Sequence, residues 1–188
     1  MIPYTTTARA DTGVSNVTLG IWLFLASEVM LFGALFSSYA LLRVSAPAWP
    51  AGSQYLSLPI GAANTAVLML MTGLFWRARS VPWPAARRLI LVSCALALVF
   101  LGFKSLEYSS EIRRGFLPAV NTFLATYFTL TGLHALHVIG GLGANLWAAT
   151  GVARVGPEMT AGRVRALSLY WAFVDLVWLI IFVLFYLS

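Results

Sequence analysis

Four ionisable side chains lie inside long apolar stretches of the sequence. Glu28 stands in LASEVMLF, Asp175 in YWAFVDLVW, and His134 and His137 share TGLHALHVIGG. A charged side chain at the centre of a lipid bilayer costs about 2.5–3.5 kcal/mol on insertion scales, so such residues are rare and usually paired or functional. We therefore take these four as candidates for buried polar contacts or proton-linked roles.

Glu28 cannot face lipid as a bare carboxylate. It is either protonated or paired with a histidine or a hydroxyl inside a helix bundle. Two interpretations stay open: a proton-handling or switching group, and a hydrogen-bonded pin between helices, which is favoured. For Asp175, whose apolar stretch carries no lysine or arginine, we predict an interhelical hydrogen bond, with a proton path as the less favoured alternative.

His134 and His137 are three residues apart, which places them on one face of a helix. That spacing can bind a metal, but a zinc or copper site needs further ligands, and only Glu28 or Asp175 could supply them. We therefore expect no metal here. The favoured role is a polar contact between helices, with His134 paired to Glu28.

Motifs for other chemistry are missing from the sequence. It has no glycine-rich phosphate loop, no serine–histidine–acid set and no CxxCH haem motif, and its single cysteine, Cys94, allows no intrachain disulfide. Two histidines are too few for the haem and copper ligands of a respiratory catalytic subunit. We expect a chain with no catalytic centre and no bound cofactor of its own.

The composition indicates a membrane protein. Of 188 residues, 60% are hydrophobic and 10% are charged, against roughly a quarter charged in soluble domains. The mean hydropathy is +0.85. The net charge of +6 does not indicate nucleic-acid binding, because the basic residues cluster at the ends of apolar runs, as in membrane proteins.

Five apolar stretches are each long enough to cross the roughly 30 Å hydrocarbon core of a bilayer. All should be α-helices, because lipid offers no water to satisfy open backbone groups. The fold class is therefore all-α, a bundle of five transmembrane helices in a single membrane domain, 1–188. The expected helices cover about 17–42, 55–76, 89–108, 119–149 and 166–187.

The distribution of basic residues predicts the orientation. Cytoplasmic ends of helices carry an excess of lysine and arginine. One side carries eight basic residues, namely Arg9, Arg77, Arg79, Arg87, Arg88, Arg154, Arg163 and Arg165. The other side carries four, namely Arg43, Lys104, Arg113 and Arg114. The bias predicts a cytoplasmic N-terminus and a C-terminus outside.

Two further patterns predict local contacts. Lys104 and Glu107 are three residues apart near the end of the third stretch, which favours a local ion pair close to the membrane interface. In the fourth stretch, glycines and alanines at 140–148 form a stripe of small residues that would let helices approach closely.

Five stretches together resemble subunit III of haem–copper terminal oxidases, in its short five-helix bacterial form. GIWLFLASEVMLFGALF carries the membrane Glu28, PIGAANTAVLMLMTG carries Asn64, and SLEYSSE carries Glu107. TYFTLTGLHALHVIGG carries the two histidines, and LYWAFVDLVWLIIF carries Trp171, Asp175 and Trp178. The stretches occur in the family's order, each in a predicted helix. One departure is Ala172, where the family usually has a histidine.

The resemblance implies a non-catalytic accessory subunit of a proton-pumping respiratory oxidase that reduces oxygen to water. The chain would pack against oxidase subunits I and II, stabilise the catalytic subunit, which holds the haem and copper, and bind phospholipid in a cleft between helix groups. The family's membrane glutamate, here Glu28, is associated with an oxygen route and with stable proton uptake. The expected location is the bacterial inner membrane, and either cytochrome c or quinol could be the electron donor.

The sequence leaves two alternatives. One is a subunit-III-like accessory protein of a nitric oxide reductase system, which the small size and Ala172 leave open. The other is a free-standing transporter or channel, which is disfavoured because the sequence offers no evident row of polar residues lining a water path.

Overall fold

The computed structural model describes residues 7–151 and 157–188, with only the backbone described at 151, 157 and 158. Its elements are α1 (Asn16–Ser45), the short 3-10 helix η1 (Gly52–Gln54), α2 (Leu58–Ala78), α3 (Trp83–Arg113), α4 (Thr122–Gly151) and α5 (Pro157–Tyr186). All five α-helices include a segment long and apolar enough to cross a membrane. Since the described residues form no strand, the predicted all-α bundle of five membrane helices is confirmed.

Most helices are longer than their apolar segments. The third begins at Trp83 and ends at Arg113, rather than at about 89 and 108, and the fifth begins at Pro157 rather than at about 166. Hydropathy marks only the part inside hydrocarbon, whereas a helix can continue into the polar interface. Proline also suits the first helical turn, where its missing N–H costs nothing, and Pro84 and Pro157 both occupy such positions.

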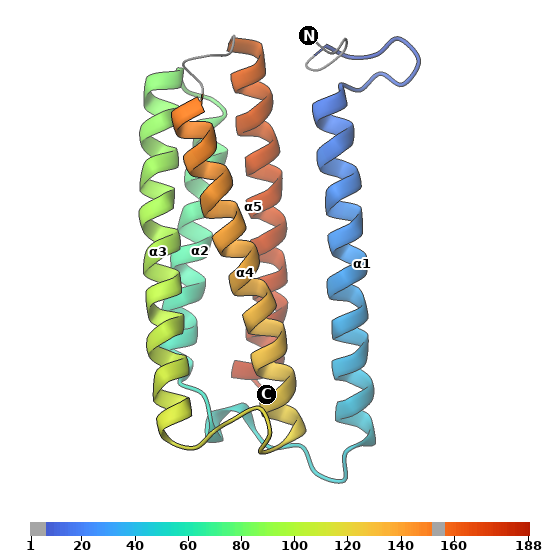
Figure 1. Cartoon of the computed structure of the whole chain (residues 1–188), viewed down its shortest axis with the longest axis vertical. Helices are drawn as coiled ribbons and strands as arrows, with labels where there is room; N and C mark the ends of the chain where they lie inside the picture. The colour runs from blue at the N-terminus through green and yellow to red at the C-terminus, as the bar shows by residue number, and fades with distance from the viewer. Residues whose placement is uncertain (1–6, 152–156) are drawn as a thin grey trace.

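Helices α2 to α5 form a four-helix bundle, and α1 stands at its side (Figure 1). Within this arrangement α1 packs mainly on α5 and touches α4 only sparsely. The N-terminal end of α1 and the C-terminal end of α5 lie at opposite ends of the molecule (Figure 1). An odd number of crossings is compatible with the predicted orientation, which stays a prediction; Arg154, one of the residues behind it, lies outside the described residues.

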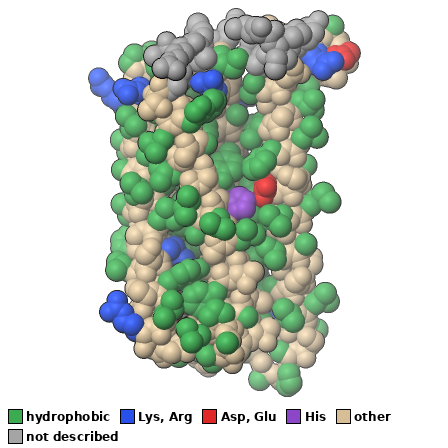
Figure 2. All heavy atoms as spheres, in the orientation of Figure 1, with side chains coloured by type: hydrophobic (Ala, Val, Ile, Leu, Met, Phe, Trp, Pro, Cys, Tyr) green, Lys and Arg blue, Asp and Glu red, His purple; other side chains and the backbone are tan. Residues whose placement is uncertain are grey.

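The two parts of the molecule differ in burial. The bundle encloses large aromatic side chains such as Phe100, Trp171 and Trp178, each at most 1% exposed. In α1 only Phe32 and Tyr39 are buried. Hydrophobic side chains cover the visible surface over most of its length, and basic ones gather mainly near the two ends (Figure 2). Helix α1 is therefore held by few contacts within this chain.

Among the three glycines of the predicted small-residue stripe in α4, Gly141 is the one that another helix approaches closely. A Cβ on Gly141 would lie 2.6 Å from the ring of Trp171 and 2.7 Å from that of Tyr170. Gly140 and Gly143 have nothing within 4 Å of the same position. Close packing of α4 on α5 therefore requires a glycine at 141 and not at its two glycine neighbours.

Candidate functional site: polar contacts between the helices

Glu28 joins α1 to α4. Its Oε2 lies 2.8 Å from Nε2 of His137, and both side chains are 14% exposed. The histidine ring also packs against Phe32, with ring centroids 5.0 Å apart. Sequence reasoning paired Glu28 with His134, which was wrong: one helical face carries both histidines, and only the structure shows which of them reaches α1.

The hydrogen bonds of His137 require a proton on Nδ1 and at least one proton in the contact with Glu28. Its Nδ1 lies 2.8 Å from the carbonyl oxygen of Leu133, and because a carbonyl only accepts, Nδ1 must carry a hydrogen. The contact between Nε2 and Glu28 then holds at least one proton, placed on the carboxyl or on the imidazole. With one proton there, the pair can be neutral or an ion pair, without a change in its geometry.

His134 lies in the core of the bundle instead. It is 0% exposed, and its ring centroid is 5.7 Å from that of Phe100 and 5.2 Å from that of Trp178. Neither ring nitrogen has a hydrogen-bond partner among the described residues. The residue fills space between α3, α4 and α5 and ties no helix to α1.

The polar residues of α5 face α2 and α4. Trp178 donates from Nε1 to Oγ1 of Thr65, at 3.0 Å, and Trp171 donates to Oδ1 of Asn145, also at 3.0 Å. These indole bonds join α5 to both neighbours. The family-matching tryptophans are therefore placed as packing and hydrogen-bonding residues.

Asp175 and Asn64 are buried without complete hydrogen bonding. Asp175 is 7% exposed and Asn64 is 0% exposed. Oδ1 of Asp175 and both side-chain polar atoms of Asn64 lack partners among the described residues. Thr72 of α2 is the polar neighbour of Asp175, but the geometry falls short of a hydrogen bond. The interhelical bond predicted for Asp175 stays a prediction.

A second polar cluster lies near the C-terminal end of α3. Nζ of Lys104 is 2.6 Å from Oε2 of Glu107, which confirms the predicted ion pair. Nζ also donates to the hydroxyls of Tyr127, at 2.9 Å, and Tyr186, at 3.1 Å. Lys104 and Glu107 are each only 3% exposed. The pair is thus enclosed between α3, α4 and α5 rather than lying on a surface.

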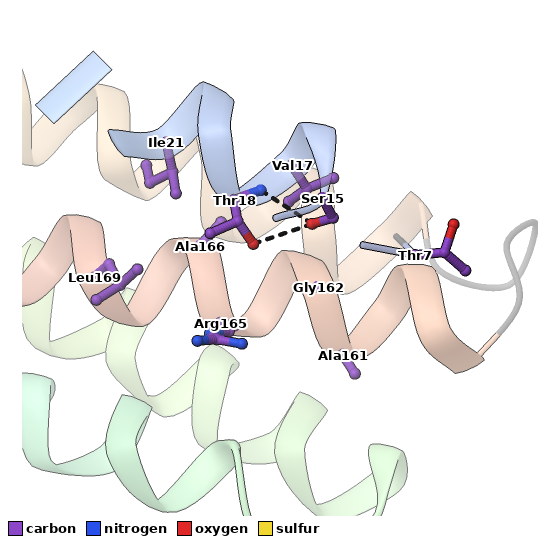
Figure 3. A pocket seen from close by; sticks show the side chains of 10 residues that line it. All are labelled: Thr7, Ser15, Val17, Thr18, Ile21, Ala161, Gly162, Arg165, Ala166 and Leu169. Carbon is purple, nitrogen blue, oxygen red and sulfur yellow. Dashed lines mark hydrogen bonds between the residues drawn. The ribbon is translucent and has the colours of Figure 1, made fainter. Parts of the chain in front are cut away.

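A groove runs between α1 and α5 towards α4. Its first hollow, of about 400 Å³, lies between the start of α1 and α5, lined by the hydroxyls of Ser15 and Thr18 and by Arg165 (Figure 3). A second hollow, of about 340 Å³, is apolar and reaches Gly140 and Tyr170. Ile21 and Ala166 line both. The groove is therefore polar at one end and apolar along the rest.

In the described part of the chain, the side chains that could bind a metal do not converge on one site. Within the described residues, no three side chains of histidine, cysteine, aspartate or glutamate come together. Both ring nitrogens of His137 make hydrogen bonds, to Glu28 and Leu133. His134 is packed against aromatic rings, and Cys94 is a buried free thiol. These residues do not fit a haem or copper centre.

Comparison with known proteins identifies the family. The model of the family described as cytochrome c oxidase subunit III matches residues 5–188. Subunit 3 of the cytochrome bo(3) ubiquinol oxidase of Pseudomonas aeruginosa is 32% identical over 185 residues, which cover 94% of this chain and 87% of that protein. Cytochrome c oxidase subunit 3 of Bacillus sp. (strain PS3) is 28% identical over 180 residues, or 92% of this chain and 86% of that protein.

The fold defines the class of protein: a five-helix membrane protein with polar side-chain contacts between its helices. With the match over 5–188, the chain belongs to the cytochrome c oxidase subunit III family. The predicted resemblance and the prediction of an accessory subunit of a haem–copper oxidase are thereby confirmed. So is the location as a multi-pass protein of the inner membrane. No finding favours a nitric oxide reductase partner.

Sequence reasoning missed three residues in or beside the polar cluster around Lys104 and Glu107, namely Glu111 of α3, Tyr127 of α4 and Tyr186 of α5. Glu111 continues the spacing of Lys104 and Glu107 at intervals of three and four residues, which places all three on one helical face. That spacing could have identified it. Tyr127 and Tyr186 carried no such pattern, since a tyrosine in an apolar helix is equally typical of a membrane interface.

Proposed function

We propose that this chain is a non-catalytic accessory subunit that packs against subunits I and II of a proton-pumping oxidase reducing oxygen to water. The haem and copper belong to the catalytic partner subunit, and this chain stabilises that partner. The observation that carries the proposal is the family match over residues 5–188. Its described titratable side chains support it, since Glu28 pairs with His137 and Lys104 with Glu107, and no metal-ligand set gathers in the part of the chain that the structure describes.

Association with subunit I has separate support from one relative. The protein of Aeropyrum pernix named heme-copper oxidase subunit I+III is 30% identical over 188 residues, which cover 92% of this chain but 23% of that protein. In that relative the region similar to this chain is part of one polypeptide with a subunit I. A stable contact between the two is therefore compatible with this fold.

Phospholipid is the proposed occupant of the groove between α1 and α5. Arg165 and the hydroxyls of Ser15 and Thr18 at its polar end suit an anionic headgroup. The apolar part, from Ile21 and Ala166 to Tyr170, suits an acyl chain. Ala166→Phe would fill the shared part of the groove and should lower the lipid phosphorus that co-purifies with the complex, whereas Ala172→Phe serves as a control outside the lining.

The experiment that tests the function is isolation of the complex through a tag on this chain, in mild detergent from the native membrane. The eluate is analysed by its reduced-minus-oxidised spectrum, its subunits, and its consumption of oxygen and nitric oxide. We expect haem bands, subunits I and II, and oxygen uptake. Supplying cytochrome c and then quinol identifies the donor, because the relatives include oxidases named for each.

Two results would contradict the proposal. Nitric oxide uptake without appreciable oxygen uptake would place the chain in a nitric oxide reductase system. Transport activity of this chain alone in reconstituted vesicles, with no haem protein bound, would support the alternative of a free-standing transporter or channel. A matched preparation from cells expressing the untagged chain corrects for haem proteins that bind the resin.

A further inference from the structure

We infer that Lys104, Glu107 and Glu111 form a buried proton-binding site that holds one exchangeable proton on the carboxyl of Glu111. The site lies at the C-terminal end of α3, on the side of the membrane predicted to be outside. The inference does not rest on the proposed oxidase function, because it concerns the charge balance of three side chains of this chain.

The first step is the hydrogen bonding of the cation. An ammonium group has three donors. Those of Lys104 are taken by Glu107, Tyr127 and Tyr186, at 2.6, 2.9 and 3.1 Å. Tyr186 in turn donates to both carboxylate oxygens of Glu107, at 2.8 and 2.7 Å. The cation is therefore fully satisfied by one carboxylate and two phenols, and it has no donor left for a second carboxylate.

Aromatic rings complete the surroundings of this cation. Nζ of Lys104 lies 5.0 Å from the ring centroid of Tyr108, 4.9 Å from that of Tyr127, 5.4 Å from that of Trp178 and 5.8 Å from that of Tyr186. Ring faces attract a cation and stabilise it away from water. The arrangement favours a charged Lys104 paired with a charged Glu107.

The second carboxyl is the unbalanced group. Glu111 follows Glu107 by one helical turn and is 2% exposed. Neither of its carboxyl oxygens has a hydrogen-bond partner among the described residues. If it were ionised, two carboxylates would face one ammonium, and the extra negative charge would be buried without hydrogen bonds, at high cost. One proton on Glu111 makes the cluster neutral.

The charged and titratable groups around Glu111 do not remove this excess charge. On its own helix and at the helix end they are Glu107, Lys104, Tyr108 and Arg114. Arg114 is exposed and lies over the ring of Phe116, 4.7 Å from its centroid. From α4 and α5 the facing groups are tyrosines 127 and 186. Helix α2 contributes none at this end, because its only charged residue, Arg77, lies in its last turn.

The proton can be exchanged with water at this end of the molecule. Glu111 lies in the last turn of α3. Glu111 itself does not line the hollow of about 310 Å³ at this end, but the adjacent Arg113 and Arg114 are exposed to water. Loading the site forms one O–H bond on the Glu111 carboxylate with a proton from water, and unloading reverses this step. The step is a proton transfer, and no group is oxidised or reduced.

Infrared spectroscopy of the complex isolated through this chain tests the site. The variants are Glu111→Gln and Glu107→Gln, and the control is Asp11→Asn, which removes an exposed carboxylate already paired with Arg9. Spectra are recorded at neutral pH in H₂O and in D₂O, as wild type minus variant. The readout is the C=O stretch of a protonated carboxyl.

We expect the same result from both cluster variants. Glu111→Gln removes the protonated carboxyl, and Glu107→Gln leaves Glu111 as the only carboxylate beside Lys104, so it loses its proton. Each, and also their double variant, should give the band of one protonated carboxyl in the difference spectrum, and Asp11→Asn should give none. The band should shift to lower frequency in D₂O. Glu107→Gln also keeps the test valid if Glu111→Gln fails to assemble.

Other outcomes would overturn the inference. No band difference in either variant means that Glu111 is ionised. A band twice as large in the difference spectrum of the double variant Glu107→Gln/Glu111→Gln means that both carboxyls are protonated beside a neutral lysine. A band that does not shift in D₂O means that the proton is not exchangeable with water.

Discussion

Glu28 of α1 and His137 of α4 meet at 2.8 Å and connect the outlying helix to the bundle. A second polar contact from α1 is that of Tyr39, whose hydroxyl donates to the carbonyl oxygen of Leu184 at 2.9 Å. Because few residues of α1 are buried within this chain, these contacts have a large share in positioning it. The effect of removing them should appear in how firmly the subunit is retained.

Replacing Glu28 distinguishes a structural hydrogen bond between helices from a role in proton transfer. Glu28→Gln keeps a hydrogen bond to His137, so subunit retention and initial turnover should match wild type. Glu28→Leu leaves Nε2 of His137 unpaired and should cost about 1 kcal/mol. The measurement is the temperature at which half the subunit is lost from the complex in mild detergent, together with initial turnover. Lost turnover in a fully assembled Glu28→Gln complex would contradict the pin and indicate proton handling.

His134 should behave as a core residue. His134→Ala opens a cavity between Phe100 and Trp178 and should destabilise the chain by about 2–4 kcal/mol. His134→Leu fills much of the space and removes two unpaired ring nitrogens, so its thermal unfolding should stay close to wild type. If His134→Leu destabilises as much as His134→Ala, the ring nitrogens make a required contact, for example to a buried water.

Two glycines of one helix form a matched pair. Gly141→Ala places a methyl group 2.6 Å from the Trp171 ring, whereas Gly143→Ala meets nothing within 4 Å. Overpacking should cost Gly141→Ala about 1–3 kcal/mol. Gly143→Ala should be neutral or slightly stabilising within this chain, since alanine is the better helix former. Thermal unfolding of both variants is the measurement, and equal effects would refute the close approach of α4 and α5 at residue 141.

The number and type of helices could be predicted from sequence because both follow from local physics. A long apolar run in lipid has to be helical, and its length decides whether it crosses. The helix ends were less predictable. Hydropathy falls where the chain leaves hydrocarbon, but α3 continues past the predicted end near 108 to Arg113, and Glu111 in this extension is buried.

The partners of the buried polar residues depend on tertiary packing. The ion pair of Lys104 and Glu107 is local, three residues apart on one helix, and could be predicted. The choice between His134 and His137 as the partner of Glu28 depends on the rotation of α4 against α1. A spacing of three residues leaves both on one face, so the sequence alone could not make that choice.

The buried pair of Lys104 and Glu107 should show strong coupling. Lys104→Met removes the cation and leaves Glu107 enclosed, 3% exposed, without its partner. Breaking a buried pair by removing one member costs about 3–5 kcal/mol. Glu107→Gln should cost less, since the amide can still accept from Tyr186. In the double variant the uncompensated charge is gone, so it should unfold at a higher temperature than Lys104→Met alone.

A double-mutant cycle measures that coupling, and the exposed pair of Arg9 and Asp11 is its control. Their atoms approach to 3.1 Å, with side chains 40% and 63% exposed. Solvent screens such a pair, so Asp11→Ala should change stability by less than about 1 kcal/mol. Additive effects of Lys104→Met and Glu107→Gln would show that the two side chains are not coupled and would contradict the enclosed pair. A coupling well above that of the surface pair would show that burial, and not proximity alone, gives this contact its strength.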